Sequence, residues 1–185
     1  MKIVLLDQPL NYDGLQLATS FVDSHCPESD RDSVILFEGE ADVPVEHLVD
    51  LEDAEAGDVI YSPWMAHIII EHRGIDLRSG VLAQRLLMRL LARWLEERSG
   101  QSLQIRGDDL FLGERKLTVS IATTSPRGVL IHTAINVRTE NTPVPAAGLR
   151  DLRVPALDLL KAIARLYADE MASVEHATTK VRPAL

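Results

Sequence analysis

The stretch "DDLFLGERKLTVSIATTSPRGVLIHTAINV" (residues 108–137) is the most informative part of the chain for the fold. Apolar and polar residues alternate along 115–124 and again along 129–137, which is the period of a half-buried β-strand. Pro126 and Gly128 stand between the two runs and are typical of a turn. The stretch therefore predicts a β-hairpin.

Four polar residues interrupt this apolar hairpin, namely Lys116, Ser120, His132 and Asn136. An odd-length connecting loop would gather all four on one face, whereas an even loop would separate the two strands' polar sets. A one-residue slip moves every side chain across the sheet, and the sequence leaves the register open. On one face, a cation and polar donors above a sheet would suit an anionic ligand.

The rest of the chain alternates between short strands and helices. This pattern predicts an α+β fold in one domain, residues 1–185, with a mixed or mostly antiparallel sheet covered by helices. Strands are expected at 2–7, 33–38, 58–62, 65–72, 103–106 and 109–112, and helices at 14–23, from Pro44 to about 49, 79–98 and 155–176.

Composition narrows the function classes. The net charge of −9 argues against binding a nucleic-acid backbone. No apolar run is long enough to cross a bilayer, and Met1 leads into only four apolar residues before Asp7. A cytoplasmic protein that is not bound to a membrane is expected. Cys26 is the single cysteine, so no intrachain disulfide can form.

The hairpin region resembles the catalytic core of the biotin and lipoate protein ligase superfamily. Those domains carry an Asn/Asp-Asp dipeptide, a turn, a strand of the type (G/D)RK(L/I)(A/S)G, and a strand that ends in Ile-Asn. The matching residues here, in the same order, are Asp108, Asp109, Gly113, Arg115, Lys116, Leu117, Ile135 and Asn136. The whole chain also resembles a small prokaryotic family of unknown function.

The resemblance implies a fold like the ligase core and an activity on a small carboxylic acid. Lys116 would be the catalytic residue that contacts the acid's carboxylate and the phosphate of its acyl-adenylate. ATP and Mg²⁺ would be the cofactors, an acceptor protein the partner, and Asp108 and Asp109 would position the metal or nucleotide. A fixed ammonium in a partly dry cleft stabilises the charge that builds during such a reaction.

The chain departs from the phosphate-binding loops of the superfamily. Biotin enzymes carry GRGRxGR and lipoate ligases carry RRxSGGG, whereas residues 52–62 here are acidic and contain one glycine. Thr118 to Ser120 stand where a glycine follows the lysine. An acidic loop would repel a triphosphate unless a metal intervened.

Further candidates are weaker. Transferases of this fold use a cysteine that follows the lysine strand, whereas Cys26 precedes it and is expected to be a partly buried, inert thiol. His67 and Glu71 share a strand face, and Glu71, at the end of a buried strand, is expected to meet a cation or border a cleft. Ser125 is a turn hydroxyl that could contact a ligand. Residues 50–53 could hold a divalent metal, but a solvated acidic loop is the simpler interpretation.

Three functions follow from these observations. The leading hypothesis is an acyl ligase or acyltransferase-like enzyme that acts on a small carboxylic acid or its thioester. The alternative is a non-catalytic small-molecule-binding protein that has lost the adenylation loop. The third is an interaction protein, a homo-oligomer whose sheet edge pairs between subunits.

Overall fold

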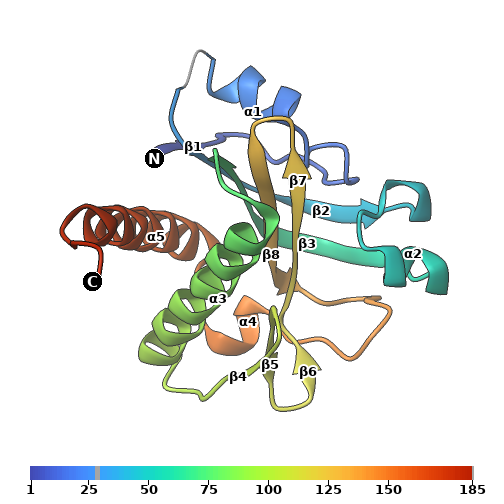
Figure 1. Ribbon diagram of the computed structural model, residues 1–185. Coiled ribbons are helices and arrows are strands. Elements are labelled where there is room, and N and C mark those ends of the chain that lie inside the picture. Colours follow the sequence, from blue (N-terminus) through green and yellow to red (C-terminus); the bar gives the residue numbers. More distant parts are fainter. Residues whose placement is uncertain (28–29, 185) are drawn as a thin grey trace.

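The computed structural model describes residues 1–27 and 30–184. Its centre is a five-stranded sheet in the order β1-β2-β3-β8-β7 (Figure 1). Only β1 and β2 are parallel neighbours, and the other pairs are antiparallel. The predicted α+β class with a mixed, mostly antiparallel sheet is therefore confirmed. The strands are β1 (Lys2–Leu5), β2 (Ser33–Val43), β3 (Ile60–Arg73), β7 (Thr118–Ser125) and β8 (Gly128–Arg138).

Two long helices cover one face of this sheet, α3 (Leu77–Ser99) and α5 (Ala156–Thr179) (Figure 1). Ile68 of β3, Leu87 of α3 and Ile163 of α5 meet in one fully buried cluster. Each such side chain contributes about 1.5–3 kcal/mol through its removal from water. Helix α3 begins where the Asp76 carboxylate accepts a hydrogen bond from the Ser79 amide and ends at Gly100 in the left-handed conformation.

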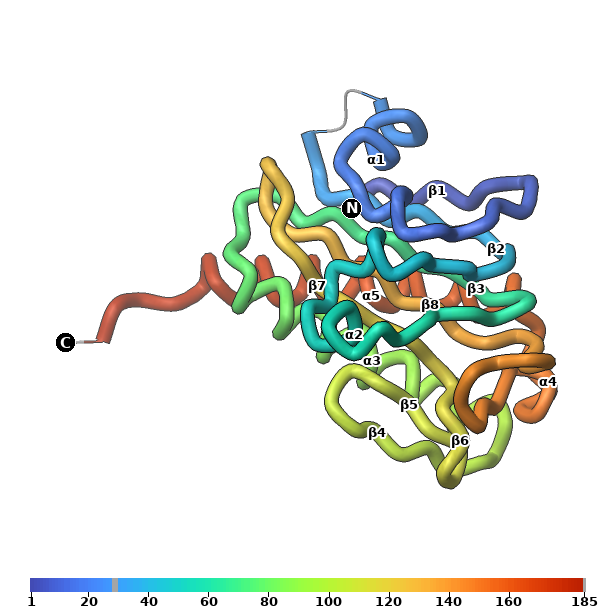
Figure 2. Tube along the Cα trace, turned by 90° about the vertical axis from the view of Figure 1, so that its right-hand side faces the viewer, coloured from blue at the N-terminus to red at the C-terminus, as the bar shows by residue number. Residues whose placement is uncertain are grey.

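The other face is covered in part by the N-terminal segment, which includes α1 (Thr19–His25). Val22 and Cys26 pack there against Phe37 of β2 and Ile69 of β3. Figure 2 shows this segment along the upper side of the sheet. The remainder of the face is open to the cavity described below.

A second, three-stranded sheet lies below the first (Figure 2). The chain passes from the small sheet into the large one at the fully buried Leu117, whose amide donates to the Leu110 carbonyl and whose carbonyl accepts from the Asn136 amide. The expected continuous strand over 115–124 is thus divided. The remaining elements are β4 (Gln104–Arg106), β5 (Asp109–Leu112), β6 (Arg115–Lys116) and α4 (Leu149–Leu152), the last in a segment for which no element was predicted.

Several predicted boundaries were wrong. The helix expected at 14–23 starts only at Thr19, because the Asp13 carboxylate accepts from the Leu15 amide and holds a turn at Gly14, where φ is +94°. The strands expected at 58–62 and 65–72 are one continuous strand, β3.

The segment after Pro44 also differs from expectation. It forms a single 3₁₀ turn, η1 (Val45–His47), and the acidic run that was expected to be a loop is helix α2 (Leu51–Ala56). The Asp50 carboxylate accepts hydrogen bonds from the Glu52 and Asp53 amides in the first turn of α2. The negative side chains of that turn also interact favourably with the positive end of the helix dipole.

No helix within the described part of the chain is both long and apolar enough to span a membrane.

Candidate functional site

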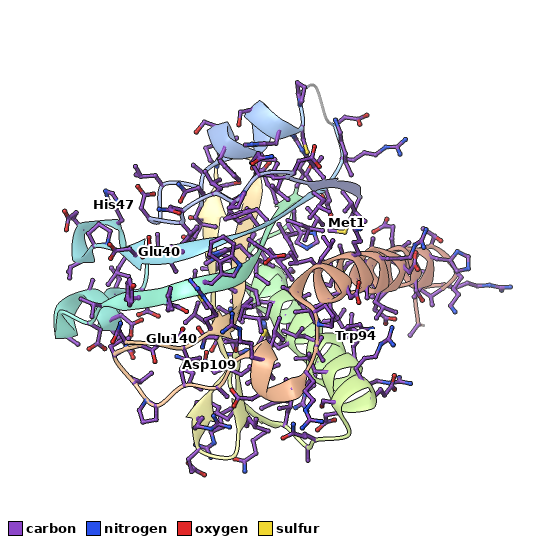
Figure 3. All side chains as sticks on the ribbon, turned by 180° about the vertical axis from the view of Figure 1, so that it is seen from behind. Met1, Glu40, His47, Trp94, Asp109 and Glu140 are labelled. Carbon is purple, nitrogen blue, oxygen red and sulfur yellow. The ribbon has the colours of Figure 1, made fainter. Side chains whose placement is uncertain are left out.

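A cavity of about 480 Å³ lies on the face of the sheet opposite α3 and α5. Met65, Val119 and Ile121 contribute to its floor, and the walls come from four separate segments. These are Tyr12 with Leu17, residues 43–62 with α2, the β5–β6 hairpin, and residues 142–146. Figure 3 labels two lining residues, His47 beside β2 and Asp109 below the sheet.

Lys116 enters this cavity from the end of β6. Its Nζ lies 2.8 Å from the Asp109 Oδ2, and the side chain keeps 33% of its surface exposed. The backbone is held on two sides, since the Lys116 amide donates to the Pro145 carbonyl and its carbonyl accepts from the Ala147 amide, both at 2.9 Å. Asn136 Nδ2 donates to the same carbonyl at 3.3 Å. The lysine stem therefore starts from a fixed point.

The two neighbouring aspartates have different partners. Burial raises the pKa of the Asp109 carboxyl, and Lys116 opposes that rise. Asp108 instead accepts hydrogen bonds from Gln84 Nε2 at 3.0 Å and Arg85 at 3.2 Å, both on α3. Both residues line the cavity, but Asp108 is also tied to the helix layer. Within the described residues, no group of three or more His, Cys, Asp or Glu side chains could hold a metal ion.

The wall formed around α2 is acidic. Asp50, Asp53 and Asp58 line the cavity together with Asp108 and Asp109, and Lys116 is the single Lys or Arg among the described lining residues. Burial raises the pKa of the Asp53 carboxyl, the neighbouring Asp50 and Asp58 raise it further, and Lys116 opposes them. The electrostatic potential here favours cations at the rim and leaves one place for an anion, beside Lys116.

Two buried histidines lie on this face of the sheet, His132 at the cavity wall and His67 behind it. His67 Nδ1 is 3.1 Å from His132 Nε2, and His67 Nε2 is 3.3 Å from the Gly39 carbonyl oxygen. The Tyr12 ring stacks on His132 with 3.8 Å between ring centroids. Burial lowers the pKa of His67 to about 3 and places that of His132 well below its ordinary value. Both rings are neutral at pH 7.

The register of the hairpin is now defined. Ser125 pairs with Gly128 across a two-residue turn, so the loop is even and Ser120 and His132 lie on opposite faces. The Ser120 hydroxyl accepts from Gln84 Nε2 at 2.9 Å and pairs with the Thr133 hydroxyl at 2.8 Å, on the α3 side. Ser120 lines the cavity at the edge strand, but its hydroxyl is engaged elsewhere.

Lys116 nevertheless shares the cavity with His132 and Asn136. Leu117 and Thr118 are both fully buried, so the alternation shifts by one residue where the chain changes sheets. That shift places Lys116 on the cavity side despite the even loop.

Other predicted site residues lie outside the cavity. His67 is completely buried behind His132. Glu71 and Ser125 meet at the far end of β3, where the Glu71 carboxylate binds Arg127 at 2.6 Å and accepts from the Ser125 hydroxyl at 3.3 Å. Cys26, expected to be partly buried, is completely buried in the apolar cluster under α1.

Sequence reasoning missed several lining residues. Tyr12 comes from a polar loop, and residues 142–146 from a Pro-rich one, both far in sequence from Lys116. Two features of the sequence could have indicated these walls. Tyr12 is a single aromatic residue in a polar run, and two prolines flank Val144 in the segment 142–146.

Solved structures of ligases share this fold. A putative lipoate protein ligase from T. acidophilum, solved with bound lipoic acid, superposes with a TM-score of 0.62 at 14% identity, covering 93% of this chain and 86% of that one. A mutant of biotin protein ligase from Aquifex aeolicus, in complex with biotin, gives 0.60 at 11% identity, covering 93% and 70%. The expected fold resemblance to both ligase classes is confirmed.

Two archaeal proteins are similar over the full chain. A protein of unknown function from Pyrococcus horikoshi has a TM-score of 0.90 and 29% identity, with both chains covered completely. The uncharacterized protein MJ0805 of Methanocaldococcus jannaschii is 30% identical over 99% of this chain and 85% of its own length. Residues 1–182 match the domain of unknown function DUF366, and the chain belongs to that family.

Proposed function

We propose that this protein binds a small carboxylic acid, or the acyl group of its thioester, in the cavity beside Lys116, as an acyl ligase or acyltransferase-like protein. One observation carries the proposal. Lys116 is the single Lys or Arg among the described lining residues, and it stands in an otherwise acidic cavity on a fixed backbone. An anion entering this cavity has one place to bind.

The chemistry of the ammonium suits this task. Lys carries three N–H donors, and Asp109 takes one of them at 2.8 Å. The other donors are available for a carboxylate, or for the oxygen on which charge builds when an acyl group is attacked. Asp109 orients the ammonium and partly offsets its charge.

The lining residues do not fit a bound triphosphate. The cavity carries five aspartates, Asp50, Asp53, Asp58, Asp108 and Asp109, against one lysine. A triphosphate is normally bound by several cations or by a run of glycine amides at a helix N-terminus. We therefore derive no adenylation step, and the thioester becomes the activated form that suits this cavity better.

The same acidic wall supports the second candidate, a non-catalytic acid-binding protein. Binding needs only Lys116 and the apolar floor, whereas transfer needs in addition an acceptor and a route for its proton. The two candidates differ in whether an acyl thioester is turned over.

Calorimetric titration with octanoate, lipoate and biotin tests the binding step. Lys116→Met should weaken binding of the best acid by roughly 10- to 150-fold, because a hydrogen bond to a charged group contributes about 1.5–3 kcal/mol. Arg106→Met is the matched control, since Arg106 pairs with Glu114 at 2.8 Å on the same small sheet but outside the cavity. Equal loss in both variants, or no binding of any acid, would contradict the proposal.

Two assays then separate the activities. Turnover of octanoyl-coenzyme A in the wild type, lost in Lys116→Met, would establish acyl transfer, and binding without turnover would favour the non-catalytic candidate. Pyrophosphate exchange with ATP, Mg²⁺ and the same acids should be absent, and Lys116-dependent exchange would show that the cavity accepts a nucleotide after all.

A further inference from the structure

The two buried histidines form a directed hydrogen-bond chain. A carbonyl oxygen only accepts, so the nitrogen that meets the Gly39 carbonyl, His67 Nε2, must carry the proton. Neutral His67 then has a bare Nδ1, which accepts from His132 Nε2–H across 3.1 Å. Neutral His132 is left with a bare Nδ1. The backbone carbonyl of Gly39 thus selects the tautomer of a ring two links away.

His132 is the member of this chain that reaches the cavity. It lines the cavity while only 4% exposed, and none of the described residues hydrogen-bonds its Nδ1. The Tyr12 ring covers it at 3.8 Å between centroids and 17° between planes. The ring cannot turn without losing the bond to His67, and any turn short of a full flip also loses the stacking. A nitrogen lone pair is therefore held in place at the cavity wall without a partner.

This acceptor lies far from the lysine. Asn136, whose side chain bonds the Lys116 carbonyl, and His132 are four residues apart on β8, a separation of about 13 Å along a strand. Val119, which pairs with Ala134, lies between their levels, and the apolar Met65 and Ile121 lie opposite Asn136 and His132. The cavity therefore has an anion-binding end, an apolar middle and a hydrogen-bond-accepting end.

We propose that the ligand is an extended aliphatic acid whose distal end carries a hydrogen-bond donor, such as a hydroxyl or an amide N–H, and that His132 Nδ1 accepts from that donor. This inference rests on the proposed function, because it places the ligand's carboxylate or acyl carbonyl at Lys116. It adds the requirement that a plain alkyl tail covers Nδ1 without giving it a donor, and such mismatches weaken binding.

Matched pairs of acids test this requirement. Octanoate, decanoate and dodecanoate are each titrated against their ω-hydroxy derivatives. For the chain length that spans the cavity, the ω-hydroxy acid should bind roughly two- to tenfold more tightly than the plain acid, the range for one neutral hydrogen bond. In His132→Phe the aromatic stacking is kept and the preference should vanish, while affinity for the plain acid stays or rises. The plain acid is thus the internal control for an intact cavity.

Nitrogen-15 spectra of the histidine side chains provide a second measurement that needs no variant. In the wild-type protein His132 should show a protonated Nε2 and a bare Nδ1, and only the ω-hydroxy acid should shift the Nδ1 resonance. A protonated Nδ1 would overturn the inference, even if His132→Phe fails to fold.

The two proposals fail in different ways. Lys116-dependent binding with no preference for any ω-hydroxy acid would overturn the role of His132 and leave the proposed function standing. Absence of binding by every acid in both series would overturn both.

Discussion

Strand β3 carries two buried polar sites on the same face, one near its C-terminal end and one near its middle. Near the end, Glu71 is 1% exposed and accepts four hydrogen bonds, two from Arg127 and one each from the hydroxyls of Thr19 and Ser125. Near the middle, His67 supports His132, whose Nδ1 has no partner among the described residues. Buried polar groups are normally satisfied, so a closed network indicates a structural role and an open one indicates a ligand.

The chemistry of the two sites differs as well. The Glu71 site joins three distant segments, since Arg127 of the hairpin turn also binds Asp23 of α1 at 2.7 Å. The cavity site instead gathers five aspartates, from α2, β5 and the residues that flank them, around one lysine. This arrangement costs folding free energy and adds nothing to the apolar core. The comparison predicts that stability depends on the first site and binding on the second.

Arg127→Met should show the largest effect on stability. It leaves the Glu71 carboxylate buried with only two hydroxyl donors, and removing one partner of a buried pair costs about 3–5 kcal/mol. Urea unfolding measures the loss, with Arg93→Met on the exposed Arg93–Glu97 pair as the control. Acid binding at 25 °C should not change. If the two variants unfold at the same urea concentration, the Glu71 site is not the structural clamp described here.

Lys116→Met should show the reverse pattern. Its ion pair with Asp109 is about a third exposed, so solvent screens it and the free energy of unfolding should change by less than about 1 kcal/mol. Binding of the best acid, however, should weaken by roughly 10- to 150-fold. A stability loss as large as that of Arg127→Met would mean that Lys116 is a structural residue.

Asp53→Asn should give the smallest effect, with a defined pH dependence. The pKa of Asp53 is raised in the folded protein, so the folded state binds its proton more tightly than the unfolded state does. The wild type therefore loses stability as pH rises through that raised pKa. Asp53→Asn should be about a few tenths of a kcal/mol more stable at pH 7, and the gain should disappear below the ordinary aspartate range. A gain that is the same at pH 3 and pH 7 would assign the effect to something other than this charge.

Local patterns in the sequence were sufficient for the regular elements. The alternation over 129–137 and the helical period over 79–98 correspond to β8 and α3, because period and capping residues act within a few positions. Helix α2 was missed because its acidic composition resembles a solvated loop, and its stability comes from the Asp50 cap and the Gly57 end.

The site shows the same division. Local sequence was enough to place Lys116, Asp108, Asp109, His132 and Asn136 along one run of strands and turns, because the alternation that identifies a strand involves only neighbouring residues. Which of these residues line the same cavity depended on the tertiary packing of the chain. The two-residue turn sets a register in which the Ser120 hydroxyl faces α3. The change of sheet at Leu117 places Lys116 on the cavity side. The Tyr12 ring stacks on His132 although the two residues are 120 positions apart in the chain. Register and long-range packing depend on the sum of many distant contacts, and no local pattern encodes that sum.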